Sequence, residues 1–293
     1  MKKKLSIADG FLIGAGIIVA GLLLQLSAGP VVWEAFAWPA NVISLAVFIA
    51  IIVAIFLLGK KFEPLRFIGT YKAAIPAMVL AVALTIIMGL TKQTVDGTWL
   101  NGMLSFWPFV LIYVYIALIL GVIILKHTTH FTWRRDIPFL LNHLGLFLAL
   151  VAATLGNADM QRMKMITIVD VPEWRVMTDD GSIQELDLAI ELKKFIMETY
   201  DDGSPKRFAS EINIYTKDGQ SFASTVDVNK PAEVKGWKIY QFGYDTLMGA
   251  MSNTSILELV RDPWLPVVYI GIYMMIAGAL TLFFVGAGRR KKS

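Results

Sequence analysis

The sequence predicts a polytopic α-helical membrane protein of about six transmembrane helices with one extracytoplasmic all-β domain, a sandwich-like antiparallel structure. Composition indicates the membrane part, because 56% of the 293 residues are hydrophobic and 17% are charged, against roughly 45–50% and 25% in soluble domains. The mean hydropathy is +0.61. The apolar residues gather in six runs, and one polar stretch of about 100 residues alternates as strands do.

Each apolar run has roughly 19–23 residues, enough for a helix to cross a hydrocarbon core of about 30 Å. The runs cover residues 8–28, 39–59, 73–91, 103–125, 137–156 and 263–285. We therefore expect a five-helix membrane domain over 1–156, a β domain over 157–262, and a sixth helix with a basic tail over 263–293. The first run is long for a signal peptide, and five more follow, so we expect it to remain uncleaved.

Basic residues predict the orientation, because they accumulate in the short loops on the cytoplasmic side of a membrane. One side of the expected membrane domain has 14 Lys and Arg residues, whereas the short loops of the other side have only Lys92. Both chain ends are thus expected in the cytoplasm, and the β domain on the extracytoplasmic side of the membrane. The net charge of +4 then reflects anchoring at the lipid surface and does not indicate nucleic-acid binding.

The polar stretch 157–262 is typical of antiparallel strands joined by tight turns. Acidic residues followed by glycine mark turns at 179–181, 201–203 and 218–219. The alternation shifts phase between Leu192 and Phe195, as a β-bulge would cause. This stretch has no histidine and the chain has no cysteine, which excludes a Ser-His-Asp triad in this domain and thiol chemistry in the chain.

His143 is the main candidate for chemistry within the membrane. It lies six residues after Ile137, roughly 9 Å along the helix and in the inner half of the bilayer. A charge there costs several kcal/mol, so the imidazole is expected to be neutral. Its residue type fits an interhelical hydrogen bond, axial ligation of haem, a proton relay or contact with a quinone. Because His127 and His130 are expected in a cytoplasmic loop, a second haem ligand would come from another chain.

Among the other polar side chains within the apolar runs, three are candidates for a specific role. Gln25 is near the outer end of the first run, where we expect an interhelical hydrogen bond or an interface position. Tyr113 and Tyr115 follow Trp107 and Pro108 in the fourth run. We expect these side chains to pack against other helices or to belong to an interfacial aromatic belt. The alternative is that they line a cofactor cleft.

Four stretches together resemble the ResB/CcsB family, a subunit of bacterial system II cytochrome c biogenesis. They are LLNHLGLFLAL at 140–150, YDDGSPKRFAS at 200–210, VDVNKPAEVKGWKIYQFGYD at 226–245 and RDPWLPVVYIGIYMMIAG at 261–278. The resemblance covers residues 137–285 well and the first two helices loosely. The third and fourth helices depart from the family pattern, which usually has three helices before the outer domain, and Trp264 stands where glycine is commoner.

The resemblance implies a partner of the CcsA/ResC type, which carries a tryptophan-rich WWD segment that this chain lacks. Together such proteins deliver haem to the outer face and attach it to the CxxCH cysteines of apocytochrome c. A thiol-reducing thioredoxin-like protein would be a further partner. The complex would lie in the lipid bilayer of a bacterial inner membrane, with the outer domain on the periplasmic side. In that family a membrane histidine of the ResB/CcsB subunit is a proposed haem ligand, and His143 is the residue of this sequence that matches.

The function we expect is therefore that of a subunit of a haem export and cytochrome c synthetase complex. His143 would ligate the iron of haem b, and Arg134 and Arg135 would meet the haem propionates, because guanidinium groups pair well with carboxylates. We expect no catalytic residue in this chain alone, since it lacks thiols and outer histidines. The alternatives are a membrane scaffold or assembly factor without haem contact, and a transporter subunit with a receiving outer domain.

Overall fold

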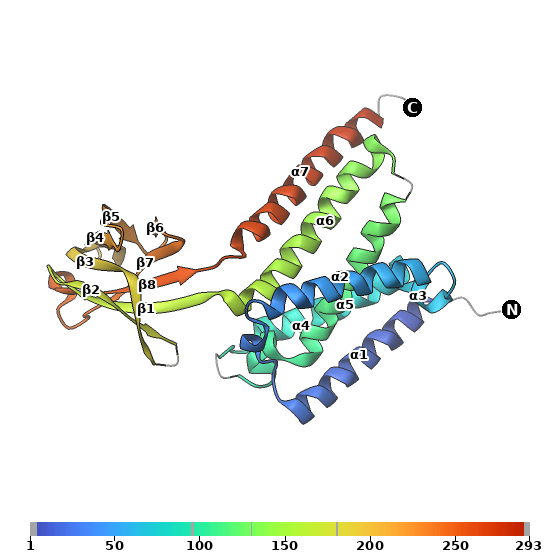
Figure 1. Cartoon of the computed structure of the whole chain (residues 1–293), viewed down its shortest axis with the longest axis horizontal. Coiled ribbons are helices and arrows are strands. Elements are labelled where there is room, and N and C mark those ends of the chain that lie inside the picture. Colours follow the sequence, from blue (N-terminus) through green and yellow to red (C-terminus); the bar gives the residue numbers. More distant parts are fainter. Residues whose placement is uncertain (1–4, 95–96, 130, 180, 290–293) are drawn as a thin grey trace. The chain divides into compact units, whose positions relative to one another are not determined.

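A computed structural model of the chain describes residues 5–94, 97–129, 131–179 and 181–289, apart from the side chains of Arg134, Arg135 and 284–289. The chain divides into two compact units. One holds the residues up to Asp159 together with those from Trp264 onwards, and the other is Met160–Pro263. Figure 1 shows the first as a group of helices and the second as a sheet, and each is described by itself.

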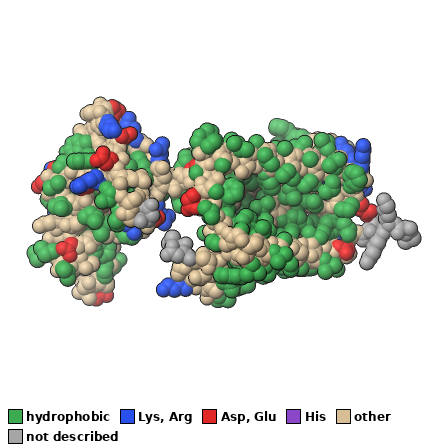
Figure 2. Space-filling model, turned by 60° about the horizontal axis from the view of Figure 1, so that its bottom comes forward, with side chains coloured by type: hydrophobic (Ala, Val, Ile, Leu, Met, Phe, Trp, Pro, Cys, Tyr) green, Lys and Arg blue, Asp and Glu red, His purple; other side chains and the backbone are tan. Residues whose placement is uncertain are grey.

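The helical unit contains six helices, among the described residues, that are long and apolar enough to cross a membrane. They are α1 (Ile7–Ala28), α2 (Ala40–Leu58), α4 (Tyr71–Leu90), α5 (Trp107–Thr128), α6 (Trp133–Gly156) and α7 (Leu265–Arg289). Four short helices connect them, namely α3 (Glu63–Ile68), η1 (Trp33–Phe36), η2 (Leu100–Ser105) and η3 (Asn157–Asp159). Hydrophobic side chains cover much of the face of the helical unit that Figure 2 shows. The predicted multi-pass membrane protein is thus confirmed.

Two helices begin four residues away from the expected position for local reasons. Helix α5 begins at Trp107 rather than at 103, because Gly102 has non-helical backbone angles and Pro108 stands in the first turn. Helix α6 begins at Trp133 rather than at 137, and the carboxylate of Asp136 accepts a hydrogen bond of 2.6 Å from the backbone N–H of Thr132. Asp136 is only 2% exposed, so this polar turn extends the helix beyond the uncharged run.

Close backbone contacts hold the last two helices of the unit together. Helices α6 and α7 run side by side (Figure 1), and their backbones come close together at Gly145 and Gly271. A Cβ atom on Gly145 would lie 2.6 Å from the Gly271 carbonyl oxygen, and one on Gly271 would lie 2.5 Å from that of Gly145. Only residues without a side chain permit this spacing, as in other membrane helix pairs.

The β unit is one eight-stranded antiparallel sheet with the order β5-β4-β3-β2-β1-β8-β7-β6. Its strands are β1 (Gln161–Ile168), β2 (Pro172–Thr178), β3 (Ile183–Thr199), β4 (Pro205–Thr216), β5 (Ser221–Asp227), β6 (Ala232–Val234), β7 (Trp237–Tyr244) and β8 (Thr254–Arg261), with η4 (Gly249–Met251) before the last. The predicted antiparallel all-β domain is confirmed. Its strands form a single sheet, whereas a sandwich would have two.

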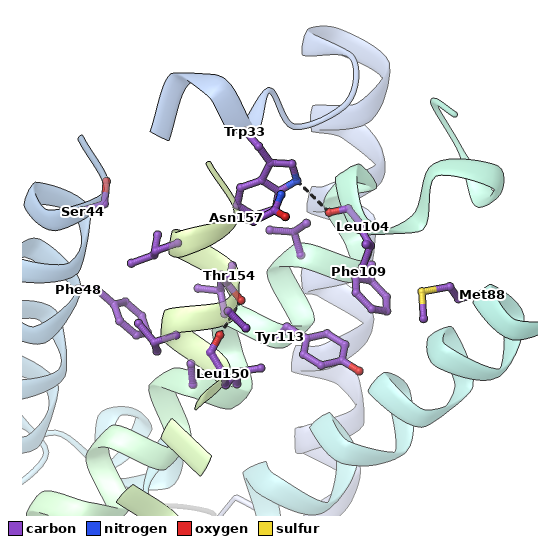
Figure 3. A pocket seen from close by; sticks show the side chains of 16 residues that line it. Trp33, Ser44, Phe48, Met88, Leu104, Phe109, Tyr113, Leu150, Thr154 and Asn157 are labelled. Carbon is purple, nitrogen blue, oxygen red and sulfur yellow. Dashed lines mark hydrogen bonds between the residues drawn. The ribbon is translucent and has the colours of Figure 1, made fainter. Parts of the chain in front are cut away.

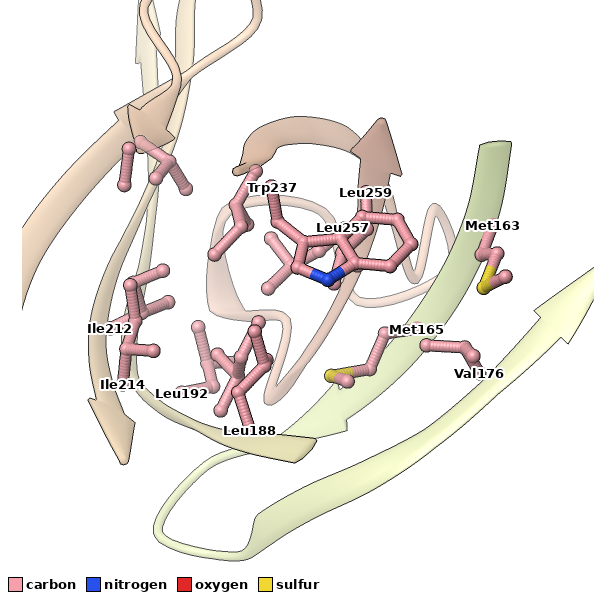
Figure 4. Packing of buried hydrophobic residues seen from close by; sticks show 14 residues of the cluster. Met163, Met165, Val176, Leu188, Leu192, Ile212, Ile214, Trp237, Leu257 and Leu259 are labelled. Atoms are coloured by element: carbon pink, nitrogen blue, oxygen red, sulfur yellow. The ribbon is translucent and has the colours of Figure 1, made fainter. Parts of the chain in front are cut away.

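The sheet curls around one hydrophobic core, so that β4 and β5 contact β6 and β7 across it. Figure 4 shows Trp237 over Leu257 and Leu259, with Met163 and Met165 on β1. A buried polar cluster also joins the two sides of the core. The Ser210 hydroxyl on β4 lies 2.6 Å from the Gln241 side-chain carbonyl on β7 and 2.8 Å from the Ser255 hydroxyl on β8.

The bulge prediction and the turns predicted at 201–203 and 218–219 are also confirmed, whereas Asp180 of the turn predicted at 179–181 lies outside the described residues. Gly203 and Gly219 have φ angles of 82° and 80°, which a glycine adopts without strain at a tight turn. The pairing of β3 with β4 shifts register between Leu192 and Lys194. This irregularity lies where the hydrophobic alternation changes phase, so that Leu192 and Phe195 are both buried.

Candidate functional site

His143 lies in the middle of α6, and one hydrogen bond determines which ring nitrogen carries its proton. Its Nδ1 is 2.9 Å from the carbonyl oxygen of Phe139, one helical turn earlier. A carbonyl oxygen can only accept, so Nδ1 is the donor. In the neutral imidazole the lone pair is then on Nε2, which has no hydrogen-bond partner among the described residues. This tautomer is the one a metal-ligating histidine has when its other nitrogen donates to a backbone carbonyl.

An aromatic stack holds the His143 ring in place. The ring lies on Phe139 with 3.7 Å between centroids, and Phe139 lies on His127 with 3.6 Å between centroids. His127 belongs to the last turn of α5, so the expectation that it lies in a loop is wrong. Side chains on a helix lean towards its N-terminus, which brings the His143 ring to the level of Phe139. The stack joins α5 to α6 at this point.

Asn142 and His143 have different surroundings, because adjacent residues on a helix point about 100° apart. A Cβ atom on Gly278 of α7 would lie 2.4 Å from the amide nitrogen of Asn142. That amide donates a hydrogen bond of 2.7 Å to the carbonyl of Pro138. Asn142 therefore belongs to the α6–α7 interface, whereas the His143 ring lies against Phe139, which stacks on His127 of α5.

The chemistry available at His143 is that of a single imidazole nitrogen. Among the residues that the structure describes, no three His, Cys, Asp or Glu side chains come together as a metal-ion site. A single nitrogen ligand suits a metal whose other ligands belong mainly to its own cofactor, as for the iron of a porphyrin. The side chains of Arg134 and Arg135, and His130 as a whole, lie outside the described residues, so the propionate contacts stay a prediction.

Of the other polar candidates within the helices, Gln25 and Tyr113 have hydrogen-bond partners and Tyr115 is buried by packing. The Gln25 side chain donates to the carbonyl of Thr98 and accepts a 3.1 Å bond from the backbone N–H of Trp107, which confirms the expected interhelical bond. Tyr113 shares a 2.9 Å hydrogen bond with Thr85. Tyr115 is 7% exposed, and its hydroxyl has no partner among the described residues.

The sequence did not indicate a carboxylate that joins three segments of the helical unit. Asp159 accepts hydrogen bonds of 2.7 Å from the backbone N–H of Trp38, from the Asn41 amide and from the Trp264 indole. Asn41 is fully buried. These residues precede or begin α2 and α7, and Asp159 follows α6. The donors are more than 100 positions from Asp159 along the chain, so no local pattern could reveal the cluster.

The helical unit also has a cavity of about 520 Å³, lined by side chains of α2, α4, α5 and α6 and of the segments before α2 and α5. Figure 3 shows Trp33 at one end, with its indole N–H bonded to the carbonyl of Leu104, and Phe48 and Tyr113 further along. On α6 the lining begins at Leu150. His143 is not among the lining residues, so the cavity is a separate feature.

Comparison with known proteins places residues 134–256 in the ResB-like family. The chain is 28% identical over 116 residues to a cytochrome c biogenesis protein CcsB of Prochlorococcus marinus subsp. pastoris, which covers 39% of this chain and 26% of that protein. A CcsB of Prochlorococcus marinus strain NATL1A is 26% identical over 126 residues, or 42% of this chain and 29% of that protein. The chain thus matches about a quarter of the length of these relatives.

A solved structure of the cytochrome c haem lyase CcmF aligns with 96% of this chain and 46% of the CcmF chain, at 14% identity and a TM-score of 0.39.

The match to the ResB-like family includes most of α6 with His143 and nearly all of the β unit. It begins within the first turn of α6 and ends within β8. Residues 134–256 are therefore a ResB-like segment, and the chain is a distant homologue of the CcsB cytochrome c biogenesis proteins.

Proposed function

We propose that this chain is a subunit of a cytochrome c biogenesis complex, in which it helps to deliver haem across the membrane for attachment to apocytochrome c. The observation that carries the proposal is the state of His143, whose Nδ1 is bonded to the Phe139 carbonyl and whose Nε2 has no partner among the described residues. The names of the related proteins, which are cytochrome c biogenesis proteins, support the same conclusion.

His143 would provide one axial ligand to the iron of haem b, the cargo of the complex. Its proton on Nδ1 keeps the ring in the orientation that the carbonyl sets, and the stack with Phe139 and His127 limits its rotation. Arg134 and Arg135 precede it by two to three turns of α6 and would pair with the propionates. A membrane partner of the WWD type would provide the second axial ligand.

The β unit would act on the periplasmic side, where the partner and apocytochrome c meet. The support is the distribution of basic residues, 14 on one side of the spans against Lys92 in the short loops of the other. The chain contains no cysteine, so the thiols of the thioether linkage would come from the apocytochrome. The haem-attachment activity would belong to the complex and not to this chain alone.

A scaffold without haem contact is the second candidate, and one observation favours it. The ring stack already gives His143 a structural role, because His143 packs on Phe139, and Phe139 in turn stacks on His127 of α5. A scaffold predicts that loss of the imidazole loosens the helices but leaves the haem content of the complex unchanged. The two candidates therefore differ in what they predict for one substitution.

The test is to purify the chain with its WWD-type partner and to measure haem per complex from the optical spectrum. His143→Ala is expected to lower the haem content at least severalfold, because one axial ligand is lost. His127→Ala is the matched control, since it removes the other imidazole of the stack and no proposed ligand, and it should retain haem. Equal haem content in the wild type and in an intact His143→Ala complex would refute the ligand role and favour the scaffold.

A further inference from the structure

The lining of the cavity in the helical unit is uncharged throughout. Its 16 lining residues include no Asp, Glu, Lys, Arg or His. A volume of about 520 Å³ is in the range of pockets that hold small organic ligands. The two carboxylates of a haem, or the head group of a phospholipid, would find no charged partner in it. A ligand of this cavity is therefore neutral.

The cavity is distinct from the proposed haem ligand. On α6 its lining extends from Leu150 to Leu155, and Asn157 follows just after the helix, whereas His143 lies seven residues before Leu150, roughly 10 Å along the helix axis. The His143 ring also leans away from the cavity, towards the start of α6. A molecule in the cavity would thus leave His143 free, and the two sites can be tested independently.

Aromatic side chains from several elements form the walls. Phe48 comes from α2, Phe109 and Tyr113 from α5, and Trp33 from the segment before α2, as Figure 3 shows. Phe109 and Tyr113 pack with 4.5 Å between ring centroids, and the Tyr113 hydroxyl is bonded to Thr85. Such walls suit a flat ring, because aromatic groups stack on one another with favourable geometry.

Two polar side chains in the lining have no hydrogen-bond partner among the described residues. They are the hydroxyl of Ser44 on α2 and the amide of Asn157 just after α6. The Ser44 side chain is half-buried and that of Asn157 is exposed, so both groups are accessible to a ligand. A ligand with carbonyl or hydroxyl oxygens would satisfy both groups, whereas a saturated acyl chain would satisfy neither.

We propose that this cavity binds a neutral lipophile with a flat ring that carries carbonyl or hydroxyl oxygens and an apolar tail, the chemistry of a membrane quinone. The ring lies between the aromatic walls, and its oxygens accept hydrogen bonds from the Ser44 hydroxyl and the Asn157 amide. The tail leaves the cavity towards the lipid. This proposal does not depend on the proposed function, because it uses no residue of the His143 site.

The test uses the full chain in detergent and a short-tailed quinone, decylubiquinone, titrated against tryptophan fluorescence, with spin-labelled stearate as the acyl-chain probe. Ser44→Ala and Asn157→Ala are each expected to weaken quinone binding by about three- to tenfold, the equivalent of one hydrogen bond. Neither should change stearate binding. Ala153→Phe, which fills the cavity, should abolish quinone binding, and Ala20→Phe on the exposed face of α1 should not.

The outcomes separate the proposal from its rivals. Selective quinone binding that Ala153→Phe abolishes supports it. Equal binding of stearate and quinone, or quinone affinity that Ser44→Ala and Asn157→Ala leave unchanged, would mean that the cavity only accommodates lipid tails. Quinone binding that survives Ala153→Phe in a folded protein would place the quinone elsewhere. Each of these last results overturns the proposal.

Discussion

Replacement of Asp159 by alanine is expected to destabilise the helical unit by about 4 kcal/mol. The carboxylate accepts three hydrogen bonds of 2.7 Å, from Trp38, Asn41 and Trp264, and a bond to a charged group contributes about 1.5–3 kcal/mol. Because Asp159 is partly exposed, we take slightly less than the low end of that range for each bond. The Asn41 amide, fully buried, would keep only its 3.3 Å bond to the carbonyl of Leu155.

The assay is thermal unfolding of the purified chain in detergent. A loss of about 4 kcal/mol corresponds to a fall in the unfolding midpoint of roughly 10 °C in a unit of this size. Trp264→Phe removes one of the three bonds and should lower the midpoint by about a third as much. The matched control is Glu34→Gln, an exposed carboxylate of η1, which should change it little.

Two results would refute this reasoning. One is an Asp159→Ala midpoint as high as that of the Glu34→Gln control. The other is a double variant, Asp159→Ala with Trp264→Phe, whose loss equals the sum of the two single losses, because both substitutions remove the same bond and their effects should not add.

Three further predictions concern packing and charge. Gly145→Val should lower the unfolding midpoint by the equivalent of about 1–3 kcal/mol, since its Cβ would lie 2.6 Å from the Gly271 carbonyl; an unchanged midpoint would contradict the close contact. Gln241→Leu leaves two buried serine hydroxyls without their acceptor and should cost the β unit about 3 kcal/mol, measured by loss of sheet signal in circular dichroism during denaturation. The hydrogen bond from Arg175 lowers the pKa of Glu173 to about 2 from its usual 4.5, so its carboxylate stabilises the fold above pH 4.5 and this contribution is lost as pH falls towards 2. Glu173→Gln should therefore make stability less dependent on pH in that window, and an identical acid profile would show that the pair contributes nothing.

Most of the fold could be predicted because its signals are local. Each span is a run of apolar residues in sequence, and the sheet appears as alternation between acidic-glycine turns such as the one at Gly203. The start of α6 was predicted four residues late, because Asp136 and its hydrogen bond to the Thr132 backbone extend the helix into a charged segment. The curl of the sheet depends on contacts between β4 and β7, which no local pattern encodes.

The candidate site could be predicted only in part, for the same reason. His143 is visible in the sequence as an imidazole in an uncharged run, and the residues of that run also carried the family resemblance. The stack of His143 with Phe139 and His127 could not be predicted from the sequence, since it depends on how the end of α5 packs against α6. Asp159 and the cavity likewise assemble from segments far apart in the chain.

The central claim, that His143 ligates haem iron through Nε2, is tested most directly by chemical rescue. The measurement is the optical spectrum of the complex that His143→Ala forms with the WWD-type partner, recorded with and without free imidazole. We predict that the variant lacks the haem bands of the wild type and regains them when imidazole occupies the vacated position as the ligand. Full haem bands in the variant without imidazole would contradict the claim.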